Sequence, residues 1–227
     1  MTRLIVCDLD GTLMPQGERT VRRALLSKIE ARIRKGTLFC VASGRPYEEL
    51  YPLFGALARD IIFICLDGAL VMHRNCVLYK KPLCKIEAAR LLSLSRKGKA
   101  YGRGKALSFS DEPSERVREK LNSLGSEVFK VSLFGERPDS SVARHCYDRG
   151  GIADYVANDA DKSVALLKVC QKFGVDTADT AALGDGENDE RMLSVVGKPY
   201  RMEKSAAALV NRGYPSVGNV ADWLERV

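Results

Sequence analysis

The chain has 227 residues, of which 45% are hydrophobic and 29% are charged, and its formal net charge is +7. This composition is typical of a soluble globular protein, and the length fits one domain with an insertion or two small domains. No apolar run approaches the ~20 residues of a membrane span, and the N-terminus lacks a signal-peptide pattern, so we expect a cytoplasmic protein.

The first third of the chain alternates short apolar runs with helical patterns. Residues 3–8 (RLIVCD) and 37–42 (TLFCVA) predict buried strands, because continuous apolar runs end there at polar residues. Between them, apolar residues spaced four apart over residues 20–35 predict an amphipathic helix with Thr20 as its N-cap. Residues 61–72 predict a further strand that enters a hairpin. Strands alternating with helices favour a parallel sheet, in which ligands bind at the carboxyl ends of the strands.

The middle of the chain has a different organisation. A predicted helix over residues 85–97 runs into the Gly- and Lys-rich stretch 96–110 (RKGKAYGRGKALSFS), which has no clear period. A helix over 112–124, a strand over 127–135 (EVFKVSLFG) and a helix around 139–149 are predicted next. Helices and strands in this order indicate a separate α+β layer.

These patterns predict two domains. We expect residues 1–82 and 158–227 to form a Rossmann-like parallel α/β core, and residues 83–157 to form an inserted α+β domain. Charge is uneven as well, because residues 80–160 carry 16 basic and 11 acidic side chains. The basic stretch 96–105 could line a ligand site or be a solvated loop. Nucleic-acid binding is disfavoured, because no run of aromatic residues for base stacking accompanies the charge.

Polar motifs follow the predicted strands. The first strand runs into DLDGT (8–12), the second into SGR (43–45), and a later one into GDGEND (184–189). Lys162 opens the helix that follows the insertion. Two carboxylates as close as those of Asp8 and Asp10 repel each other, so this strand end is either solvated or holds a cation. Taken alone, the lysine could also be a solvated residue of a first helical turn.

These motifs, in this order, resemble those of the haloacid dehalogenase superfamily of phosphohydrolases, and more narrowly of the Cof-type sugar-phosphate phosphatases. The resemblance rests on CDLDGTL, ASGRP and GDGEND, and it covers essentially the whole chain. It implies that the insertion is an α/β cap. It also implies a Mg²⁺-dependent phosphatase that hydrolyses small phosphomonoesters, expected to be sugar phosphates, through an aspartyl-phosphate. The expected partner is a small phosphorylated metabolite, and we expect no association with a membrane. The oligomeric state is left open.

The resemblance gives each motif residue a role. Asp8 is expected to be the nucleophile and Asp10 the general acid and base. Ser43 would donate a hydrogen bond to a phosphoryl oxygen, and Lys162 would offset the charge shared by the nucleophile and the phosphate. The expected oxygen ligands of Mg²⁺ are Asp8, Asp10 (through its backbone carbonyl), Asp185 and Asp189. The other expected phosphate- and substrate-binding residues are Gly11, Thr12, Gly44, Arg45 and Asn188.

The chain departs from the family pattern at two positions. Asp161-Lys162-Ser163 stands where the family usually has Asn-Lys-Gly, and Asp67-Gly68-Ala69 where it has Asn-Gly-Ala. An ionised Asp67 cannot donate a hydrogen bond as Asn would, so it either faces away or meets a cationic group such as Arg45 or a substrate hydroxyl. Two other functions stay open at this stage, a phosphomutase on the same fold and a non-catalytic phospholigand-binding protein.

Overall fold

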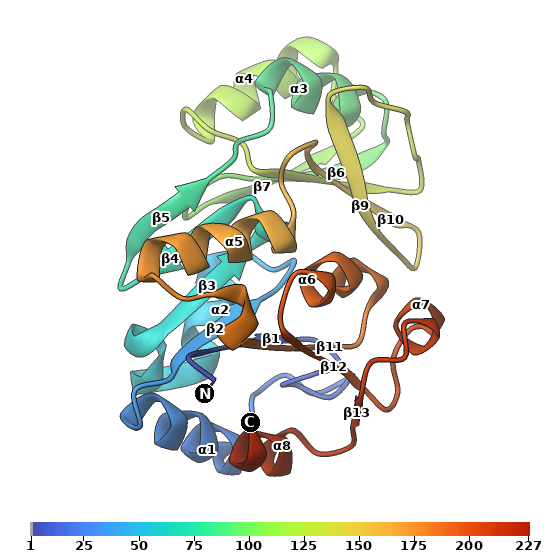
Figure 1. The fold of residues 1–227 in the computed structure, drawn as a ribbon. Coiled ribbons are helices and arrows are strands. Elements are labelled where there is room, and N and C mark those ends of the chain that lie inside the picture. The colour runs from blue at the N-terminus through green and yellow to red at the C-terminus, as the bar shows by residue number, and fades with distance from the viewer. Residues whose placement is uncertain (1) are drawn as a thin grey trace. The chain divides into compact units, whose positions relative to one another are not determined.

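The computed structural model of the protein describes residues 2–227, with the side chains of residues 147–149 outside the description. The chain divides into two compact units (Figure 1). The first contains the residues up to Tyr79 together with Lys162–Val227, and the second is Lys80–Asp161. The assignment of residues 83–157 as a cap on a catalytic core stays a prediction.

An eight-stranded sheet forms the centre of the first unit, with the order β13-β12-β11-β1-β2-β3-β4-β5. Five of its neighbouring pairs, from β13 to β3, are parallel, and β4 then runs antiparallel to β3. This arrangement confirms the predicted α/β fold with a parallel sheet. The strands are β1 (Leu4–Asp8), β2 (Leu38–Ala42), β3 (Ile61–Cys65), β4 (Leu70–His73), β5 (Cys76–Lys80), β11 (Thr180–Gly184), β12 (Lys198–Met202) and β13 (Ser216–Val217).

Helices cover both faces of this sheet (Figure 1). On one face, α5 (Lys162–Phe173) and α6 (Glu190–Ser194) pack against apolar residues of β1, β2, β3 and β11. On the other, α1 (Arg23–Arg34) packs against α8 (Val220–Arg226). The remaining short helices are α2 (Tyr47–Leu50), η1 (Tyr51–Asp60), η2 (Leu66–Gly68), η3 (Thr177–Asp179), η4 (Glu187–Asp189) and α7 (Ala207–Asn211).

The expected start of α1 at Thr20 is wrong. The helix begins at Arg23, and its N-cap position is held by Arg22, which has extended backbone and no side-chain capping bond. Val21, just before the helix, is buried, so the chain enters the helix from the core and without a capping hydroxyl. Leu25 and Ile29 are buried as the four-residue spacing predicts.

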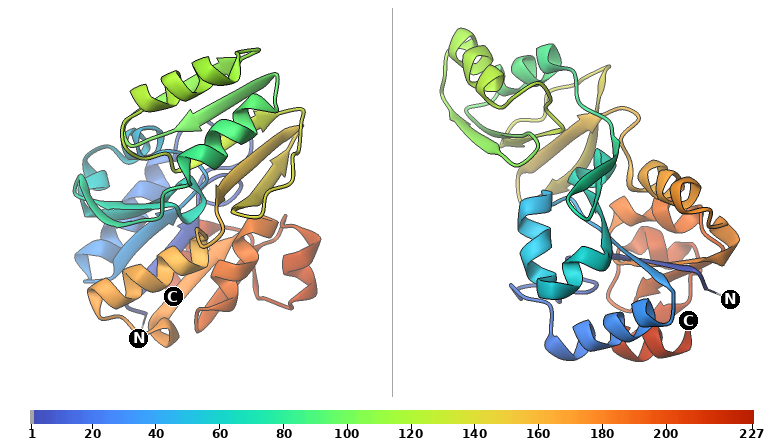
Figure 2. Two further views of the ribbon diagram at one scale, coloured as in Figure 1. Left: turned by 90° about the horizontal axis from the view of Figure 1, so that it is seen from above. Right: turned by 90° about the vertical axis from the view of Figure 1, so that its left-hand side faces the viewer.

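The second unit is an antiparallel sheet with helices on one face. Its five strands have the order β7-β6-β8-β10-β9. Two helices pack against one face of this sheet, as Figure 2 shows. The helices and the covered face share an apolar core. The elements are α3 (Lys85–Ser93), β6 (Lys97–Tyr101), β7 (Ala106–Ser110), α4 (Ser114–Ser123), β8 (Lys130–Phe134), β9 (Ala143–Arg149) and β10 (Ile152–Ala157).

The stretch 96–110, to which the sequence assigned no element, is a β-hairpin formed by the antiparallel pair β6 and β7. One expectation for this region is wrong. Residues 143–149 form the strand β9 instead of a helix, and they pair antiparallel with β10. Gly150 and Gly151, with φ of 57° and 83°, make the turn between the two strands, a backbone conformation that glycine adopts without strain.

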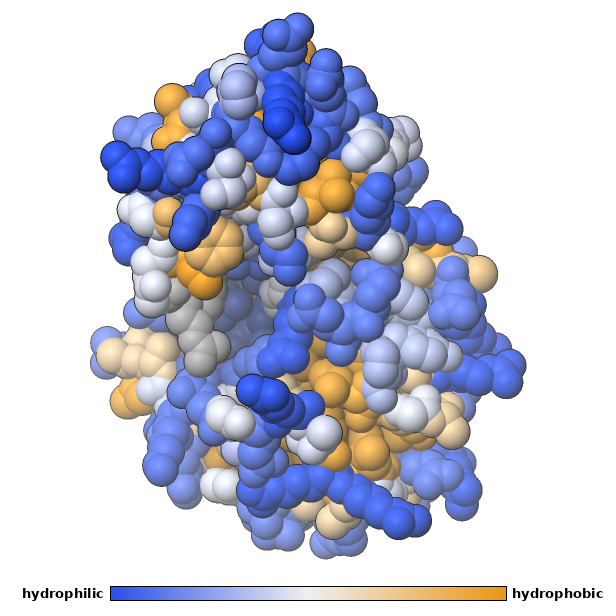
Figure 3. All heavy atoms as spheres, turned by 180° about the vertical axis from the view of Figure 1, so that it is seen from behind, coloured by the Kyte–Doolittle hydropathy of each residue, from blue (hydrophilic) through white to orange (hydrophobic). Residues whose placement is uncertain are grey.

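Hydrophilic residues cover most of the surface seen in Figure 3, with hydrophobic patches between them. Within residues 2–227, the structure contains no helix with the length and hydropathy to cross a membrane.

Candidate active site

The motif residues come from loops at one edge of the eight-stranded sheet. Because β11, β1, β2 and β3 are parallel neighbours, the loops that leave their carboxyl ends lie side by side. The N-terminus of α5 joins them through Lys162, which is bonded to residues of two of these loops. The order of the strands therefore brings together motifs that are far apart in the sequence.

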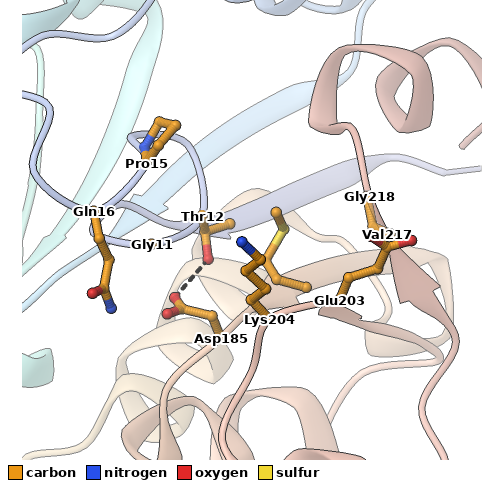
Figure 4. Close-up of a pocket in the computed structure, with 10 residues that line it drawn as sticks. Gly11, Thr12, Pro15, Gln16, Asp185, Glu203, Lys204, Val217 and Gly218 are labelled. Carbon is orange, nitrogen blue, oxygen red and sulfur yellow. Dashed lines mark hydrogen bonds between the residues drawn. The ribbon is translucent and has the colours of Figure 1, made fainter.

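The loop after β1 is a tight turn that requires glycine. Gly11 has a φ of 96°, and its N–H donates to the Met14 carbonyl at 2.8 Å. A Cβ atom at Gly11 would lie 2.1 Å from Oδ2 of Asp185, which is closer than any real contact. The next residue, Thr12, donates from Oγ1 to Oδ1 of Asp185 at 2.9 Å (Figure 4). The turn thus orients the Asp185 carboxylate from both sides.

A buried ammonium group joins two of the loops. The Lys162 Nζ donates to Oδ1 of Asp8 and to Oδ1 of Asp189, both at 2.7 Å. All three side chains are buried, Lys162 with 2% exposure, so this lysine is not a solvated first-turn residue. Burial alone would lower the pKa of Lys162, but the carboxylates of Asp189, Asp8 and Asp67 raise it above its usual value.

Three carboxylates form a cluster that could hold a cation. One oxygen from each of Asp8, Asp185 and Asp189 lies within 4.8 Å of the other two. The second oxygen of Asp189 accepts the N–H groups of Asp185 and Gly186 at 3.1 and 3.0 Å. Burial raises the pKa of Asp8 although Lys162 opposes the shift, and burial also raises the pKa of Asp185 against the Thr12 bond. Three ionised carboxylates beside one ammonium would give the cluster excess negative charge, which a cation could offset.

The second carboxylate of the DLDGT motif has a different environment. Asp10 is about one-third exposed, and its two oxygens face the guanidinium of Arg45. The Arg45 Nε donates to Oδ2 at 2.8 Å and one terminal nitrogen donates to Oδ1 at 2.5 Å. Two parallel bonds of this kind fix the orientation of a carboxylate better than one bond does.

Ser43 and Asp67 hold the next two loops together. Ser43 is buried, donates its N–H to the Ile64 carbonyl at 2.8 Å and accepts the Arg45 N–H on Oγ at 3.2 Å. The Asp67 N–H donates to the Ser43 carbonyl at 3.2 Å. Asn188 is half-buried, and its Oδ1 lies 2.4 Å from the position that a Cβ atom on Gly186 would take.

Asp67 contributes to the site in a way that the sequence did not reveal. It is buried and has left-handed backbone, with a φ of 55°. Its carboxylate lies against Gly44, where a Cβ atom would be 3.0 Å from both oxygens. Its negative charge also helps to raise the pKa of Lys162. Asp67 thus acts electrostatically on Lys162, a lysine 95 positions along the chain.

A pocket of about 590 Å³ adjoins the cluster within the first unit (Figure 4). Gly11, Thr12 and Asp185 line it together with the polar residues Gln16, Glu203 and Lys204. Its size is in the usual range for small-molecule sites. The side of the cluster at Asp185 is therefore open to small molecules.

The chain is similar to known phosphatases along nearly its whole length. The sequence profile of the haloacid dehalogenase-like hydrolases matches residues 5–112 and 139–213. The pyridoxal phosphate phosphatase YbhA of Escherichia coli (strain K12) is 34% identical, over 96% of this chain and 94% of its own length. The 5-amino-6-(5-phospho-D-ribitylamino)uracil phosphatase YbjI of the same organism is 24% identical, over 92% and 88%.

Solved structures share the fold. The sugar phosphatase BT4131, of haloacid dehalogenase subclass IIB, superposes with a TM-score of 0.80 at 18% identity, covering 98% of this chain and 95% of its own. At this level of identity the match supports the fold alone.

Proposed function

Because the chain belongs to the haloacid dehalogenase-like hydrolases and is a phosphoric monoester hydrolase, we propose that it cleaves small phosphomonoesters with Mg²⁺ and through an aspartyl-phosphate. The observation that carries this proposal is the buried contact of Lys162 with Asp8 and Asp189, 2.7 Å from each, beside Asp185. Carboxylates at this density are expensive to bury unless they bind cations and do chemistry.

In the first step, a carboxylate oxygen of Asp8 attacks phosphorus and the bond from phosphorus to the ester oxygen breaks. Asp10 gives its proton to the departing oxygen, which leaves as an alcohol. Ser43 donates a hydrogen bond to a phosphoryl oxygen, and Lys162 offsets the negative charge that gathers between Asp8 and the phosphoryl group. The product of this step is a phosphoryl group on Asp8.

In the second step, water attacks the phosphorus of the aspartyl-phosphate. Asp10 accepts the proton of this water, the bond between phosphorus and the Asp8 oxygen breaks, and orthophosphate leaves. Both carboxylates return to their starting protonation states, so the cycle is complete. The distinct environments of the two residues suit this division, since Asp8 is buried beside a lysine while Asp10 is partly exposed.

The residues present fit a hard divalent cation. Three carboxylates share one ammonium, that of Lys162, so the cluster carries excess negative charge when its carboxylates are ionised. Mg²⁺ prefers such oxygen ligands. We propose that Asp8, Asp185 and Asp189 hold it, with the Asp10 backbone carbonyl. When bound, it would supply positive charge for the phosphoryl oxygens.

The proposed substrates are sugar phosphates and similar small phosphomonoesters, and residues 83–157 are proposed as the cap that selects among them. The names of similar proteins support this class. They include a sugar phosphatase, a pyridoxal phosphate phosphatase and a phosphatase of a ribitylamino compound. Each of these substrates is a phosphate ester on a small polar molecule.

The test is phosphate release from 4-nitrophenyl phosphate and from a panel of sugar phosphates, with Mg²⁺ or with a chelator. We expect turnover only with the metal. Asp8→Asn should lower turnover by about 1000-fold or more, because an amide cannot supply the nucleophilic oxygen. Asp222→Asn, an exposed acidic residue of α8, is the control and should match the wild type.

Activity of Asp8→Asn within a few-fold of the wild type would overturn the assignment of the nucleophile. Full activity in chelator would overturn the role of the metal. Isomerisation of a sugar phosphate without release of phosphate would identify a mutase instead.

A further inference from the structure

The acidic side chains of the site differ in how many groups orient them. Asp8 is held by Lys162, and Asp185 is held by Thr12 and by the close packing of Gly11. Asp189 accepts bonds from Lys162 and from two backbone N–H groups. Asp8 and Asp189 are buried and Asp185 is partly buried, so packing restricts each of these carboxylates in addition to its hydrogen bonds.

Asp10 has a single anchor. Among residues 2–227, the Arg45 guanidinium is the one group that bonds its carboxylate, through the two contacts at 2.8 and 2.5 Å. The Asp10 side chain is 32% exposed, so packing does little to restrict its rotamers. Without the guanidinium, this carboxylate would be free to sample other orientations in water.

The backbone of Arg45 is itself held in place by hydrogen bonds at both its N–H and its carbonyl group. Its N–H donates to Oγ of Ser43 at 3.2 Å, and its carbonyl accepts the Leu66 N–H at 3.1 Å. Pro46 follows, which restricts the residue before it to extended backbone. The guanidinium is thus presented from a fixed point, and its planar fork matches the two oxygens of a carboxylate.

From this geometry we infer that Arg45 is a positioning residue, which acts through Asp10. When Asp10 carries its proton, one oxygen keeps a bond from the guanidinium and the other directs its O–H toward the oxygen of the leaving group. The inference rests on the proposed function, because it needs Asp10 to be the proton donor. It differs from the role expected from the sequence, in which Arg45 contacts the phosphate or the substrate.

The inference predicts a dependence on the leaving group. In phosphoryl transfer, negative charge develops on the departing oxygen, and a positioned acid neutralises it. A poor leaving group such as phenolate needs this proton, while the more acidic 4-nitrophenol leaves well as its anion. If the Asp10 carboxyl group loses its orientation, cleavage of phenyl phosphate should therefore fall far more than cleavage of 4-nitrophenyl phosphate.

The experiment measures kcat/KM for a series of aryl phosphates of similar size, from 4-nitrophenyl to phenyl to 4-methoxyphenyl phosphate. This parameter covers the steps up to formation of the aspartyl-phosphate and leaves out the later attack by water. For Arg45→Ala we expect a loss of about 10- to 100-fold with phenyl phosphate and of about threefold or less with 4-nitrophenyl phosphate. Arg45→Lys should lie in between, because an ammonium cannot form the fork.

Three comparisons separate positioning from a structural role. The control is Arg212→Ala, which removes a similar arginine–carboxylate pair, with Glu190 at 2.5 Å, from elsewhere on the same unit. Methylguanidinium added to Arg45→Ala should restore part of the rate with phenyl phosphate. The double variant Asp10→Asn/Arg45→Ala should depend on the leaving group no more steeply than Asp10→Asn alone, because the two residues act as one unit.

Equal losses across the series would overturn the inference and assign Arg45 to phosphate binding or to folding. Unchanged rates would overturn it as well, because the ion pair between Arg45 and Asp10 would then not contribute to catalysis. If Arg45→Ala does not fold, Arg45→Gln and Arg45→Lys carry the same comparison. A failure of the proposed function gives a different result, since Asp10→Asn would then show the leaving-group dependence of the wild type.

Discussion

The two sheets of this protein place their polar residues by different rules. In the eight-stranded sheet, helices cover both faces, and every residue of β1 and β3 is buried. In the five-stranded sheet, the helices cover one face, and the residues of β8 alternate. Val131 and Leu133 belong to the apolar core under the helices, while Lys130 and Ser132 point to the other face.

This difference between the two sheets determines where each of them can present polar side chains. A strand buried on both faces can present polar groups only at its end, so the first sheet gathers its carboxylates along one edge. An antiparallel strand can present a polar group at every second residue. In the second sheet, Lys130 bonds Asp154 at 2.6 Å, and Lys99 lies 5.1 Å from the ring centre of Tyr101, all on the face without helices. The first sheet gathers its carboxylates at one end of its strands, whereas the second carries polar side chains along one face, where Lys130, Ser132 and Asp154 are buried.

The largest effect should come from the edge of the first sheet. Asp185→Ala removes one of three clustered carboxylates, and we expect phosphatase activity to fall by about 1000-fold, with a much higher Mg²⁺ requirement. Asp185→Asn keeps an acceptor for the Thr12 hydroxyl and serves as the control for folding. Steady-state rates across a Mg²⁺ titration are the measurement. Unchanged Mg²⁺ dependence would remove Asp185 from the metal site.

A second substitution tests the two faces of the antiparallel sheet. Leu133→Ala should lower the free energy of unfolding by about 3 kcal/mol, because it opens a cavity in the core under the helices. Phe134→Ala, on the next residue and the opposite face, should cost under about 1 kcal/mol, since that side chain is 41% exposed. Urea denaturation measures both. Equal costs would contradict the assignment of the faces.

A third substitution tests the tight turn after β1, in the candidate active site. Gly11→Ala places a methyl group on Asp185 and strains a residue with a φ of 96°, and we expect activity to drop by about 30-fold. Gly17→Ala is the matched control, because Gly17 has a φ of 89° but no atom within 4 Å of the new Cβ. Gly17→Ala should lower the free energy of unfolding through backbone strain and leave kcat/KM unchanged. Equal losses of activity would mean that strain alone matters.

The smallest effect concerns the proposed cap and its basic stretch. Lys99 lies on the face without helices, whereas Arg103 is exposed in the turn after it and Lys105 donates to the carbonyl of Ser123 at 3.2 Å. We expect Lys99→Ala to lower kcat/KM by about threefold to tenfold for sugar phosphates with a second anionic group. The controls Arg103→Ala and Lys105→Ala should change little, and 4-nitrophenyl phosphate should be spared in all three. A loss at Arg103 equal to that at Lys99 would contradict this assignment.

The sequence predicts the first sheet better than the second, for a physical reason. Strands buried on both faces are continuous apolar runs, and β1, β2, β3 and β11 stand out for that reason. In β6 only Gly98 and Ala100 face the helices, so the strand has no bulky apolar residue on that face. β9 forms because it pairs with β10 across a Gly-Gly turn, and such pairing leaves little trace in local periodicity.

For the candidate site, too, the sequence predicts local features better than contacts between distant residues. The motifs predict which residues carry chemistry, because each motif is a compact stretch at a strand end. They do not predict that Arg45 faces Asp10, 35 positions away, or that Asp67 acts on Lys162. Those pairings depend on the order of the strands and on the left-handed backbone of Asp67. Sequence patterns describe neither of these.

The clustering of Asp8, Asp185 and Asp189 would also couple any cation binding to the stability of the folded chain. The three carboxylates come from segments more than 170 residues apart, so they are gathered only when the first unit is folded. A cation that binds them therefore stabilises the folded chain by mass action, by about 2.7 kcal/mol at a hundred times its Kd. Melting temperatures in different divalent cations would rank the preference of this cluster for each metal before any substrate is known.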